Sequence, residues 1–488
     1  MESKKKWLIE TVGKQNCFDD AETLEAYACD HSFVQPLKPQ FVVKPENAQE
    51  IQKIVVWANE TETPLIPVSS GLPRFRGDTV PTAPEAVVID LSRMNKILRI
   101  DRRNRIAMIE PGVTYAQLQP ELAKKDLSIS NPLLPRRSKS VIASLLEREP
   151  MLIPKYNFTL MEPLRCTEVI WGNGEKLRTG EAYGYPTLEQ GWEMGFAQVA
   201  PTGPGQTDYY RLISAAQGSM GIVVWASVRC NILPKVHKFF FIPSNNLKDL
   251  IDCAYRILRV RLGDEFLIVN NATLSSILGK NGTEIKKIKD KLPAWSIIIG
   301  IAGRDILPEE KADFEEKDIR DIAQQFGLQL VSAIPGANDR QVMEILLNPS
   351  KEPYWKLKDK GAFQDIFFLT TLDRTTEFVD IMNSEAKAKG FPISDISVYI
   401  QPQQQGVLCH CEFNLPYNPE NKAEVNRVKE LYIKGSEALI KRDAYFSRPY
   451  GIWADMVYGR DVSNTTMLKT VKGIFDPNHI LNPGKLCF

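Results

Sequence analysis

The chain ends on Ile474-Phe475-Asp476-Pro477-Asn478-His479-Ile480-Leu481-Asn482-Pro483-Gly484-Lys485-Leu486-Cys487-Phe488. Two prolines, an Asn-Pro pair and a glycine force turns in this segment. Ile474, Phe475, Ile480 and Leu481 supply apolar side chains that can anchor it. Chain ends usually fray unless such anchors hold them against the rest of the molecule. The sequence therefore predicts a folded C-terminal tail that returns to another part of the protein.

The chain has 488 residues, of which 43% are hydrophobic and 25% are charged. This composition is typical of a globular protein, and the length predicts two or three domains. The formal net charge of +1 gives no electrostatic basis for binding nucleic acid or an anionic membrane. The longest apolar runs fall short of the about 20 residues that a membrane helix needs, so we expect no membrane span.

The first seven residues, Met1-Glu2-Ser3-Lys4-Lys5-Lys6-Trp7, carry positive charge, but no apolar segment follows them. We therefore expect no secretory signal. Eight cysteines are scattered along the chain without a repeated spacing, which indicates reduced thiols and a cytoplasmic protein.

The pattern of strands and helices divides the chain into four segments. Residues 1–35 are expected to be a peripheral helical segment. Alternating strand and helix patterns over residues 36–234 predict a first domain. Residues 235–440 alternate long charged helices with apolar strands, which predicts a second, α+β domain. Residues 441–488 show no strand–helix pattern of their own, so we expect them to rejoin the first domain.

Several common cofactor motifs are missing. No G-x-G-x-x-G follows a predicted strand, and the chain contains no Walker, H-E-x-x-H or C-x-x-C motif. These absences disfavour a Rossmann dinucleotide site, and we expect no metal site. Any cofactor must then be held in another way.

One loop offers such a way. Residues 68–79, Val-Ser-Ser-Gly-Leu-Pro-Arg-Phe-Arg-Gly-Asp-Thr, follow a predicted strand at 65–68. Ser69, Ser70 and Gly71 can present backbone amides and hydroxyls to a pyrophosphate, and Arg74 or Arg76 can neutralise its charge. Taken alone, the same residues would fit an arginine-containing surface turn.

Three segments in order, residues 109–114, residues 217–223 and the C-terminal tail, resemble signatures of the vanillyl-alcohol oxidase/para-cresol methylhydroxylase (PCMH) family of flavoproteins. The resemblance implies an α+β fold. A two-part PCMH-type FAD-binding domain would span residues 36–234, and an α+β cap domain that binds substrate would span 235–440. The tail, residues 441–488, would return to the FAD domain and close over the cofactor.

The resemblance also implies which residues contact FAD. They are Ser69, Ser70, Gly71, Arg74, Pro135, Ser140, Ala143, Gly221, Ile222, Val223, Asn482 and Lys485. The sequence departs from the family pattern in two places, because the loop after residue 68 has few glycines and Val141-Ile142 replaces a glycine pair. Bulky residues at 141 and 142 are expected to push on the flavin or its phosphates.

Many relatives in this family attach FAD covalently through a histidine. This chain has only four histidines, His31, His237, His410 and His479, and none lies in the 68–79 loop. We therefore expect non-covalent FAD.

The predicted strand at 407–413 carries a candidate catalytic pair. Alternation along a strand places His410 and Glu412 on one face and Cys409 and Cys411 on the other. A histidine beside a carboxylate offers a base and a group that orients it. This region resembles the cap strand that lines the substrate pocket of the family, whereas the cysteines are interpreted as core residues.

A second patch, residues 445–453, resembles the segment in which the family places an arginine near the flavin or the substrate oxygen. Arg448 would stabilise negative charge there. Tyr450 would wall an aromatic pocket, whereas Trp453 is interpreted as packing. The residues expected to be catalytic are thus His410, Glu412, Arg448 and Tyr450.

The resemblance favours an FAD-dependent oxidoreductase that takes hydride from an alcohol-type carbon onto flavin N5. A para-substituted phenol or aryl alcohol is the expected substrate, with a 2-hydroxy acid as the alternative. A catalytically degenerate flavoprotein-like subunit and a binding protein for another nucleotide remain open as further readings. The electron acceptor is open as well, and includes a partner protein such as a cytochrome, an iron–sulfur protein or an electron-transfer flavoprotein. Assembly as an oligomer or complex subunit is equally open.

Overall fold

The computed structural model describes residues 2–159, 162–205 and 208–488. At its N-terminal end lies a small sheet with the strand order β1-β2-β4-β3, in which β2, β4 and β3 run parallel. Its strands are β1 (Cys17–Phe18), β2 (Phe41–Val43), β3 (Leu65–Val68) and β4 (Val87–Asp90). Helices α1 (Glu2–Val12), α2 (Ala21–Ala28) and α3 (Ala48–Thr61) accompany it. The expectation of a helical N-terminal segment is correct for α1 and α2 but wrong for β1 and for residues 29–35, which are not helical.

A second sheet is antiparallel and has the order β5-β6-β10-β8-β9. It consists of β5 (Ile97–Asp101), β6 (Ile106–Ile109), β8 (Leu164–Trp171), β9 (Lys176–Arg178) and β10 (Gly221–Arg229). A two-stranded pair, β7 (Leu127–Ser128) and β11 (Asn231–Ile232), packs beside helix α4 (Tyr115–Ala123). The other helices of this part are α5 (Val141–Leu146), α6 (Leu188–Glu193) and α7 (Tyr210–Ile213). Thr114 caps α4 in a capping box with Gln117, as its position before the helix predicts.

The largest sheet has six antiparallel strands in the order β12-β14-β13-β18-β19-β17. The strands are β12 (Val236–Ser244), β13 (Phe266–Asn270), β14 (Trp295–Gly303), β17 (Ala362–Thr370), β18 (Ser397–Gln403) and β19 (Leu408–Tyr417). Separate hydrophobic clusters pack on its two faces. A sheet covered on both sides accommodates continuous apolar runs such as Ile297-Ile298-Ile299, all of which are buried.

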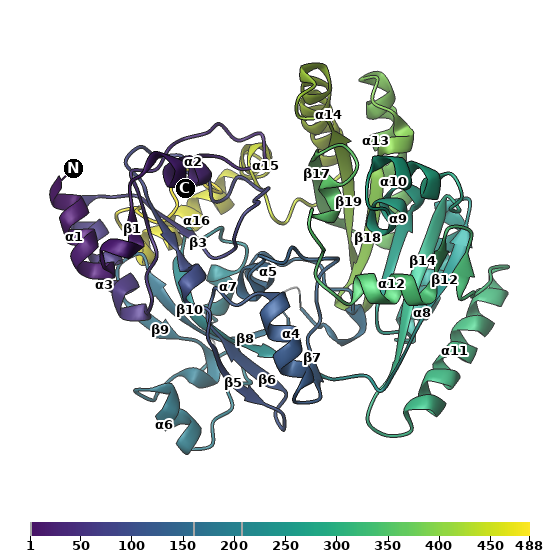
Figure 1. The fold of residues 1–488 in the computed structure, drawn as a ribbon, viewed down its shortest axis with the longest axis horizontal. Helices are drawn as coiled ribbons and strands as arrows, with labels where there is room; N and C mark the ends of the chain where they lie inside the picture. The colour runs from purple at the N-terminus through teal and green to yellow at the C-terminus, as the bar shows by residue number, and fades with distance from the viewer. Residues whose placement is uncertain (1, 160–161, 206–207) are drawn as a thin grey trace.

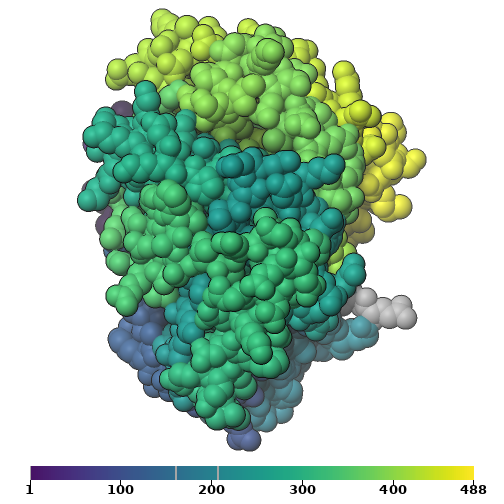
Figure 2. Space-filling view, turned by 90° about the vertical axis from the view of Figure 1, so that its right-hand side faces the viewer, coloured from purple at the N-terminus to yellow at the C-terminus, as the bar shows by residue number. Residues whose placement is uncertain are grey.

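The helices of this part are α8 (Leu247–Arg259), α9 (Asn271–Leu278), α10 (Gly282–Lys289), α11 (Pro308–Gln325), α12 (Asp339–Leu346), α13 (Thr375–Ala388) and α14 (Lys422–Ile440), with a small hairpin of β15 (Ala333–Ile334) and β16 (Ala337–Asn338). They lie around the sheet at the right of Figure 1, with α11 outermost. From that side, green and teal residues of this part cover most of the visible face (Figure 2). The observed architecture is the expected α+β fold, while the domain bounds at 36, 235 and 441 stay a prediction.

The C-terminal tail rejoins the first part of the chain, as predicted, and it does so at the N-terminal sheet. After α15 (Ile452–Tyr458) and α16 (Val462–Phe475), Leu481 forms a parallel bridge with Leu65 of β3. Ile480 and Leu481 are buried in the same hydrophobic cluster as β2, β3 and β4. Figure 1 shows the yellow C-terminal helices beside the purple N-terminal elements.

In the parts of the chain that the structure describes, every helix is too short or too polar to cross a membrane.

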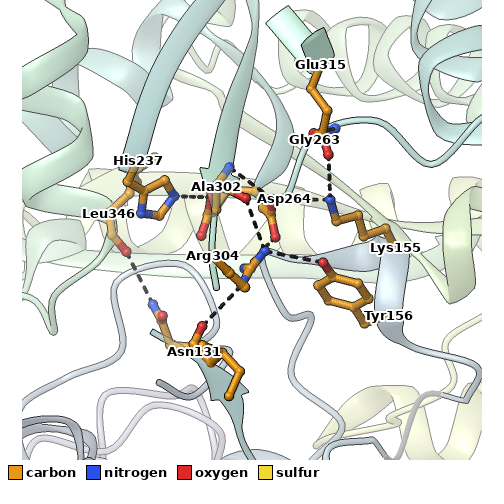
Figure 3. A network of polar contacts seen from close by, with 12 residues as sticks. Asn131, Lys155, Tyr156, His237, Gly263, Asp264, Ala302, Arg304, Glu315 and Leu346 are labelled. Carbon is orange, nitrogen blue, oxygen red and sulfur yellow. Dashed lines mark hydrogen bonds and ion pairs between the residues drawn. The ribbon is translucent and has the colours of Figure 1, made fainter. Parts of the chain in front are cut away.

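A buried polar network joins the six-stranded sheet to the segment around Lys155 (Figure 3). Asp264, which is 0% exposed, lies 3.1 Å from Lys155 Nζ and 2.6 Å from Arg304 Nη2. Arg304 also donates to the Tyr156 hydroxyl at 3.3 Å. Two cations around one buried carboxylate satisfy its charge, so these contacts hold the two parts of the fold in one arrangement.

His237 adds a pH-dependent contact to this junction. Burial lowers its pKa, but the Glu265 carboxylate, 2.8 Å from its Nε2, reverses this and leaves the pKa above the ordinary 6.5. Asp264 raises this pKa further and Arg304 opposes it. A group with a raised pKa stabilises the fold fully below its unfolded-state pKa and loses that stabilisation as pH rises through the folded pKa.

We therefore expect the free energy of unfolding of the wild type, relative to His237→Gln, to be greatest below about pH 6.5 and to fall at higher pH. Urea unfolding of both proteins across this range measures the difference. A difference that does not change with pH would contradict the ion pair with Glu265.

Candidate active site

A large cavity lies between the first two sheets and the six-stranded sheet; it is called the reaction cavity below. Its volume is about 1580 Å³, counting the open space at its mouth. The loop after β3, the start of α5, the start of β10 and strands β17 to β19 supply its walls. The cavity extends from the loop after β3 to the strands of the six-stranded sheet, so a ligand bound in it contacts both parts of the fold.

Eight of the residues expected to bind a cofactor lie on the cavity wall. They are Ser69, Ser70, Arg74, Pro135, Ala143, Gly221, Ile222 and Val223. The Arg74 guanidinium does not point freely into the cavity, because it donates to Ala26 O and lies 4.5 Å from the Tyr27 ring.

The other four expected residues stand behind the wall. Gly71 N donates to Ser138 O, and Ser140 caps α5. The Asn482 amide donates to Asp78 O and Gln217 O, and Lys485 Nζ donates to Gly77 O and Val80 O. The tail residues thus hold the shape of the loop after β3 instead of lining the cavity.

Of the two bulky residues expected to push on the flavin, Val141 does not line the cavity and Ile142 does. Ser140 is the N-cap of α5, so Val141 and Ile142 are the first two residues of the helix. The side chains of Val141 and Ile142 are both buried in the hydrophobic cluster of the second sheet.

At the cap end, a chain of charged and polar side chains crosses β17 and β19. Lys356 Nζ lies 2.8 Å from Asp365 Oδ2 and 2.5 Å from Glu412 Oε1. The other Glu412 oxygen is 3.0 Å from His410 Nε2, and His410 Nδ1 is 3.3 Å from Arg448 Nη2. All five side chains are buried, so each charge depends on its neighbours in the chain.

The alternation predicted for this strand is confirmed, since His410 and Glu412 share one face and Cys409 and Cys411 are buried in the core on the other. Of the expected base and the carboxylate that orients it, only the carboxylate reaches the cavity. Glu412, Arg448 and Tyr450 line the cavity, whereas His410 lies behind them. Burial lowers the pKa of His410 to about 4, although Glu412 opposes this. His410 is therefore neutral at pH 7, accepting from Arg448 at Nδ1 and donating to Glu412 from Nε2.

The carboxylates of the chain differ in their proton affinity. Burial and the nearby Glu412 charge raise the pKa of Asp365 above its ordinary value, although Lys356 and Arg76 oppose this. Glu412 also loses solvation, but Lys356 and His410 outweigh that effect and hold its pKa well below the usual range. Asp365 is therefore the better proton acceptor of the two.

Aromatic rings surround this chain. Phe75, Tyr354, Trp355, Phe363, Tyr399 and Tyr450 all line the same end of the cavity. The guanidinium groups of Arg76 and Arg448 each lie 4.3 Å from the Phe367 ring. Burial raises the pKa of Tyr354 to about 12 and that of Tyr399 well above 10, so these hydroxyls are hydrogen-bond donors at neutral pH.

Sequence reasoning missed Lys356 and Asp365, and left Arg76 as an alternative to Arg74. One signal for Asp365 was present: it is an acidic residue inside the apolar strand Ala362–Thr370. A charge buried in such a strand needs a partner, and Lys356 supplies it from the turn at Trp355–Leu357 that precedes the strand. Within the described residues, no group of three or more His, Cys, Asp or Glu side chains is arranged to hold a metal ion.

The far end of the cavity suits a polar, phosphate-containing ligand. Within the described part of the chain, Arg74 Nε and Thr79 Oγ1 on its wall are buried without a hydrogen-bond partner, and both can donate to a phosphate oxygen. Gly218, which has φ +70, and Gly221 bring bare backbone to the wall.

Comparison with known proteins decides what that ligand is. A family profile described as "FAD binding domain" matches residues 39–146, and one described as "FAD linked oxidases, C-terminal domain" matches residues 409–486. The chain belongs to the FAD-linked oxidoreductases. FAD is its cofactor, and the two profiles fall on the two sides of the reaction cavity.

Individual relatives align with nearly the whole of this chain at low sequence identity. An uncharacterised FAD-linked oxidoreductase of Mycobacterium tuberculosis is 21% identical over 97% of both chains. A glycolate oxidase subunit of Bacillus subtilis is 24% identical over 99% of this chain and 96% of its own. The crystal structure of p-cresol methylhydroxylase with substrate bound has a TM-score of 0.86 at 17% identity and covers 100% of this chain and 96% of its own. This last likeness establishes the PCMH-type fold.

Gly221 gives a prediction for the cofactor end. A Cβ there would lie 2.6 Å from Val169 Cγ1 and 3.2 Å from Ile170 O, so Gly221→Ala must push β10 away from β8. We expect a loss of about 1–3 kcal/mol in unfolding free energy and weaker FAD binding, measured by urea unfolding and FAD titration. Gly473→Ala is the control, because nothing lies within 4 Å of its Cβ position. Unchanged FAD affinity in Gly221→Ala would show that this backbone does not form the cofactor wall.

Proposed function

We propose that this FAD-linked oxidoreductase oxidises a para-substituted phenol or aryl alcohol at the cap end of the reaction cavity. The observation that carries the proposal is the ring of aromatic side chains around the buried chain from Asp365 to Arg448. Aromatic walls with a few convergent polar groups are what an aromatic substrate needs for binding and orientation. The fold shared with p-cresol methylhydroxylase supports the same substrate class.

FAD, when bound, supplies the capacity to accept a hydride. The cofactor end would be held by Ser69, Ser70 and the backbone of Gly221 to Val223, which line the cavity. Gly71, Ser140, Asn482 and Lys485 would act indirectly, by fixing the loops that carry these contacts.

The chain's own residues would handle the substrate's hydroxyl group. Arg448 and Tyr450 would hold its oxygen and stabilise negative charge on it. Asp365 would accept its proton, because its pKa is raised and it lies on the cavity wall. His410, with both ring nitrogens engaged, would act as a positioning residue that orients Glu412 and Arg448.

A 2-hydroxy acid is the second candidate. Arg76 and Arg448 lie on the cavity wall, and guanidinium groups bind carboxylates well. The similarity to a glycolate oxidase subunit points the same way. Anaerobic mixing of the FAD-loaded protein with 4-hydroxybenzyl alcohol, 4-ethylphenol, glycolate and D-lactate separates the two. Loss of flavin absorbance with the phenols alone is expected, and loss with the hydroxy acids alone would reverse the assignment.

We propose that FAD is bound non-covalently. In the described parts of the chain, none of the four histidines lies on the cavity wall. His31 stacks on Phe75, His237 is at the junction, His410 lies behind Glu412 and Arg448, and His479 is in the tail. Acid precipitation is expected to release the yellow colour into the supernatant. Colour that stays with the pellet would contradict the proposal.

For the electron acceptor, we propose a partner protein in the cytoplasm, such as a cytochrome, an iron–sulfur protein or an electron-transfer flavoprotein. Comparing re-oxidation of the reduced protein by oxygen and by cytochrome c tests this, and faster re-oxidation by oxygen would contradict it.

A further inference from the structure

A second cavity adjoins the cap end of the reaction cavity. Its volume is about 810 Å³, counting the open space at its mouth. Four residues line both cavities: Phe75, Arg76, Asp365 and Tyr450. These four side chains are therefore the partition between the two spaces.

The cap end of the reaction cavity is closed to solvent by its own walls. Lys356, Tyr399, Glu412 and Arg448 are all less than 10% exposed. A substrate that reacts there must reach it through the body of the protein, and bound FAD would take up the opposite end. The second cavity is the space that adjoins the cap end directly.

The second cavity opens to solvent and has an aromatic lining. Gly451 and Asp455 on its wall are exposed, and Ser32 is half-buried. Deeper in, its walls are mostly apolar and aromatic, formed by Phe33, Val34, Phe367, Tyr432, Ile452 and Trp453. Such a lining favours a small aromatic molecule over a carboxylate, which would also meet the negative charges of Asp455 and Asp365.

Arg76 is the movable member of the partition. Its guanidinium lies 4.3 Å from the Phe367 ring and 5.5 Å from the Tyr450 ring. In the part of the chain that the structure describes, it is held by these ring contacts and by longer-range attraction to Asp365, Glu149 and Glu412, and not by a hydrogen bond or ion pair. The side chain can therefore swing aside without breaking a hydrogen bond, while remaining attracted back to the same place.

We propose that the second cavity is the access route for the aromatic substrate and that Arg76 is its gate. This rests on the proposed function, because it assumes that an aromatic molecule reacts at the cap end. A small phenol would pass Val34 and Ile452, displace the Arg76 guanidinium from Phe367 and Tyr450, and enter beside Asp365. The guanidinium would then return and close the reaction cavity to water.

The test is stopped-flow binding of 4-nitrophenol to the FAD-loaded protein, followed by the change in flavin absorbance. A residue on a route slows association and dissociation equally and leaves the dissociation constant unchanged, whereas a residue that contacts the bound ligand changes the constant. Val34→Trp and Ile452→Trp each narrow the second cavity, from two different segments of its wall. If one variant fails to fold, the other still tests the route. We expect both rate constants to fall about tenfold or more in each. Val407→Trp, at a 73% exposed site away from both cavities, is the control.

Arg76→Ala should have the opposite effect and raise both rate constants. Rate constants that stay at the wild-type value in both tryptophan variants, with FAD still bound, would overturn the access route. Failure of the proposed function looks different, because the wild type itself would then not bind 4-nitrophenol. Binding of oxalate, a dead-end mimic of 2-hydroxy acids, in place of 4-nitrophenol would overturn the proposed function and, with it, a route for an aromatic substrate.

Discussion

Arg448→Met is expected to slow substrate-dependent flavin reduction by about 10²–10³-fold, the usual effect of removing one donor that stabilises developing charge. Arg448 lines the reaction cavity and lies 3.3 Å from His410 Nδ1. Burial lowers its pKa to about 10, so it still carries its charge at neutral pH. The variant therefore removes both the positive charge and the hydrogen bond that fixes the His410 tautomer. Anaerobic stopped-flow measurement of the limiting rate constant gives the effect.

The same variant should keep its FAD, because Arg448 lies at the cap end of the cavity. Arg448→Lys keeps the positive charge but lacks the planar guanidinium group, so it should recover only part of the rate of flavin reduction. Arg340→Met, at an exposed arginine on α12, is the matched control and should behave as the wild type. A limiting rate constant that Arg448→Met leaves unchanged would remove Arg448 from the mechanism.

Lys472→Met is expected to lower the free energy of unfolding by about 3–5 kcal/mol, the cost of leaving a buried charge without its partner. Lys472 and Asp476 are both 0% exposed and form an ion pair within the C-terminal segment. Lys472 Nζ also donates to Ser219 O, beside the cavity wall, and to Leu481 O at 3.1 Å. Asp476 in turn accepts from Ile480 N and Leu481 N. The pair therefore fastens the returning tail to the β10 side of the cavity, and FAD binding should weaken as well.

Two further variants separate charge from packing in this prediction. Lys472→Met combined with Asp476→Asn leaves no uncompensated charge and keeps an acceptor for one of the two backbone amides, so it should recover part of the lost stability. Lys434→Met breaks an exposed pair with Glu437 and should cost about 0–1 kcal/mol. Urea unfolding of the four proteins gives the comparison. Equal losses for Lys472→Met and Lys434→Met would show that the tail does not depend on this pair.

The backbone of the site was predictable from local patterns. The alternation of side chains along a strand placed His410 and Glu412 on one face of β19, and the turns and apolar anchors of the tail predicted that it rejoins the first domain. Both predictions rest on patterns among residues that are close together in the sequence. Local patterns could not show which of His410 and Glu412 would reach the cavity, because Arg448 and Lys356, which set their orientation, come from distant segments.

The tail illustrates the same limit. Its turns were expected, but Asn482 and Lys485 use their side chains to bind carbonyls of the loop after β3. The packing of two distant loops decides which backbone carbonyl each of these side chains contacts. A sequence motif can therefore identify the residue but not its hydrogen-bond partner. Asp365 was missed although its partner Lys356 is near it in the sequence, because the local pattern does not show that the turn at Trp355–Leu357 folds back onto β17.

The most direct test of the account is the limiting rate constant for anaerobic flavin reduction by 4-hydroxybenzyl alcohol in the wild type and in Asp365→Asn. The amide keeps the size of the carboxylate but cannot take a proton. Loss of a general base typically costs about 10²–10⁴-fold in rate. The account predicts that the alcohol reduces the wild-type flavin, and that Asp365→Asn binds the alcohol but reduces its flavin at least 100-fold or so more slowly. Equal rate constants in the two proteins, or no reduction of the wild type by the alcohol, would contradict it.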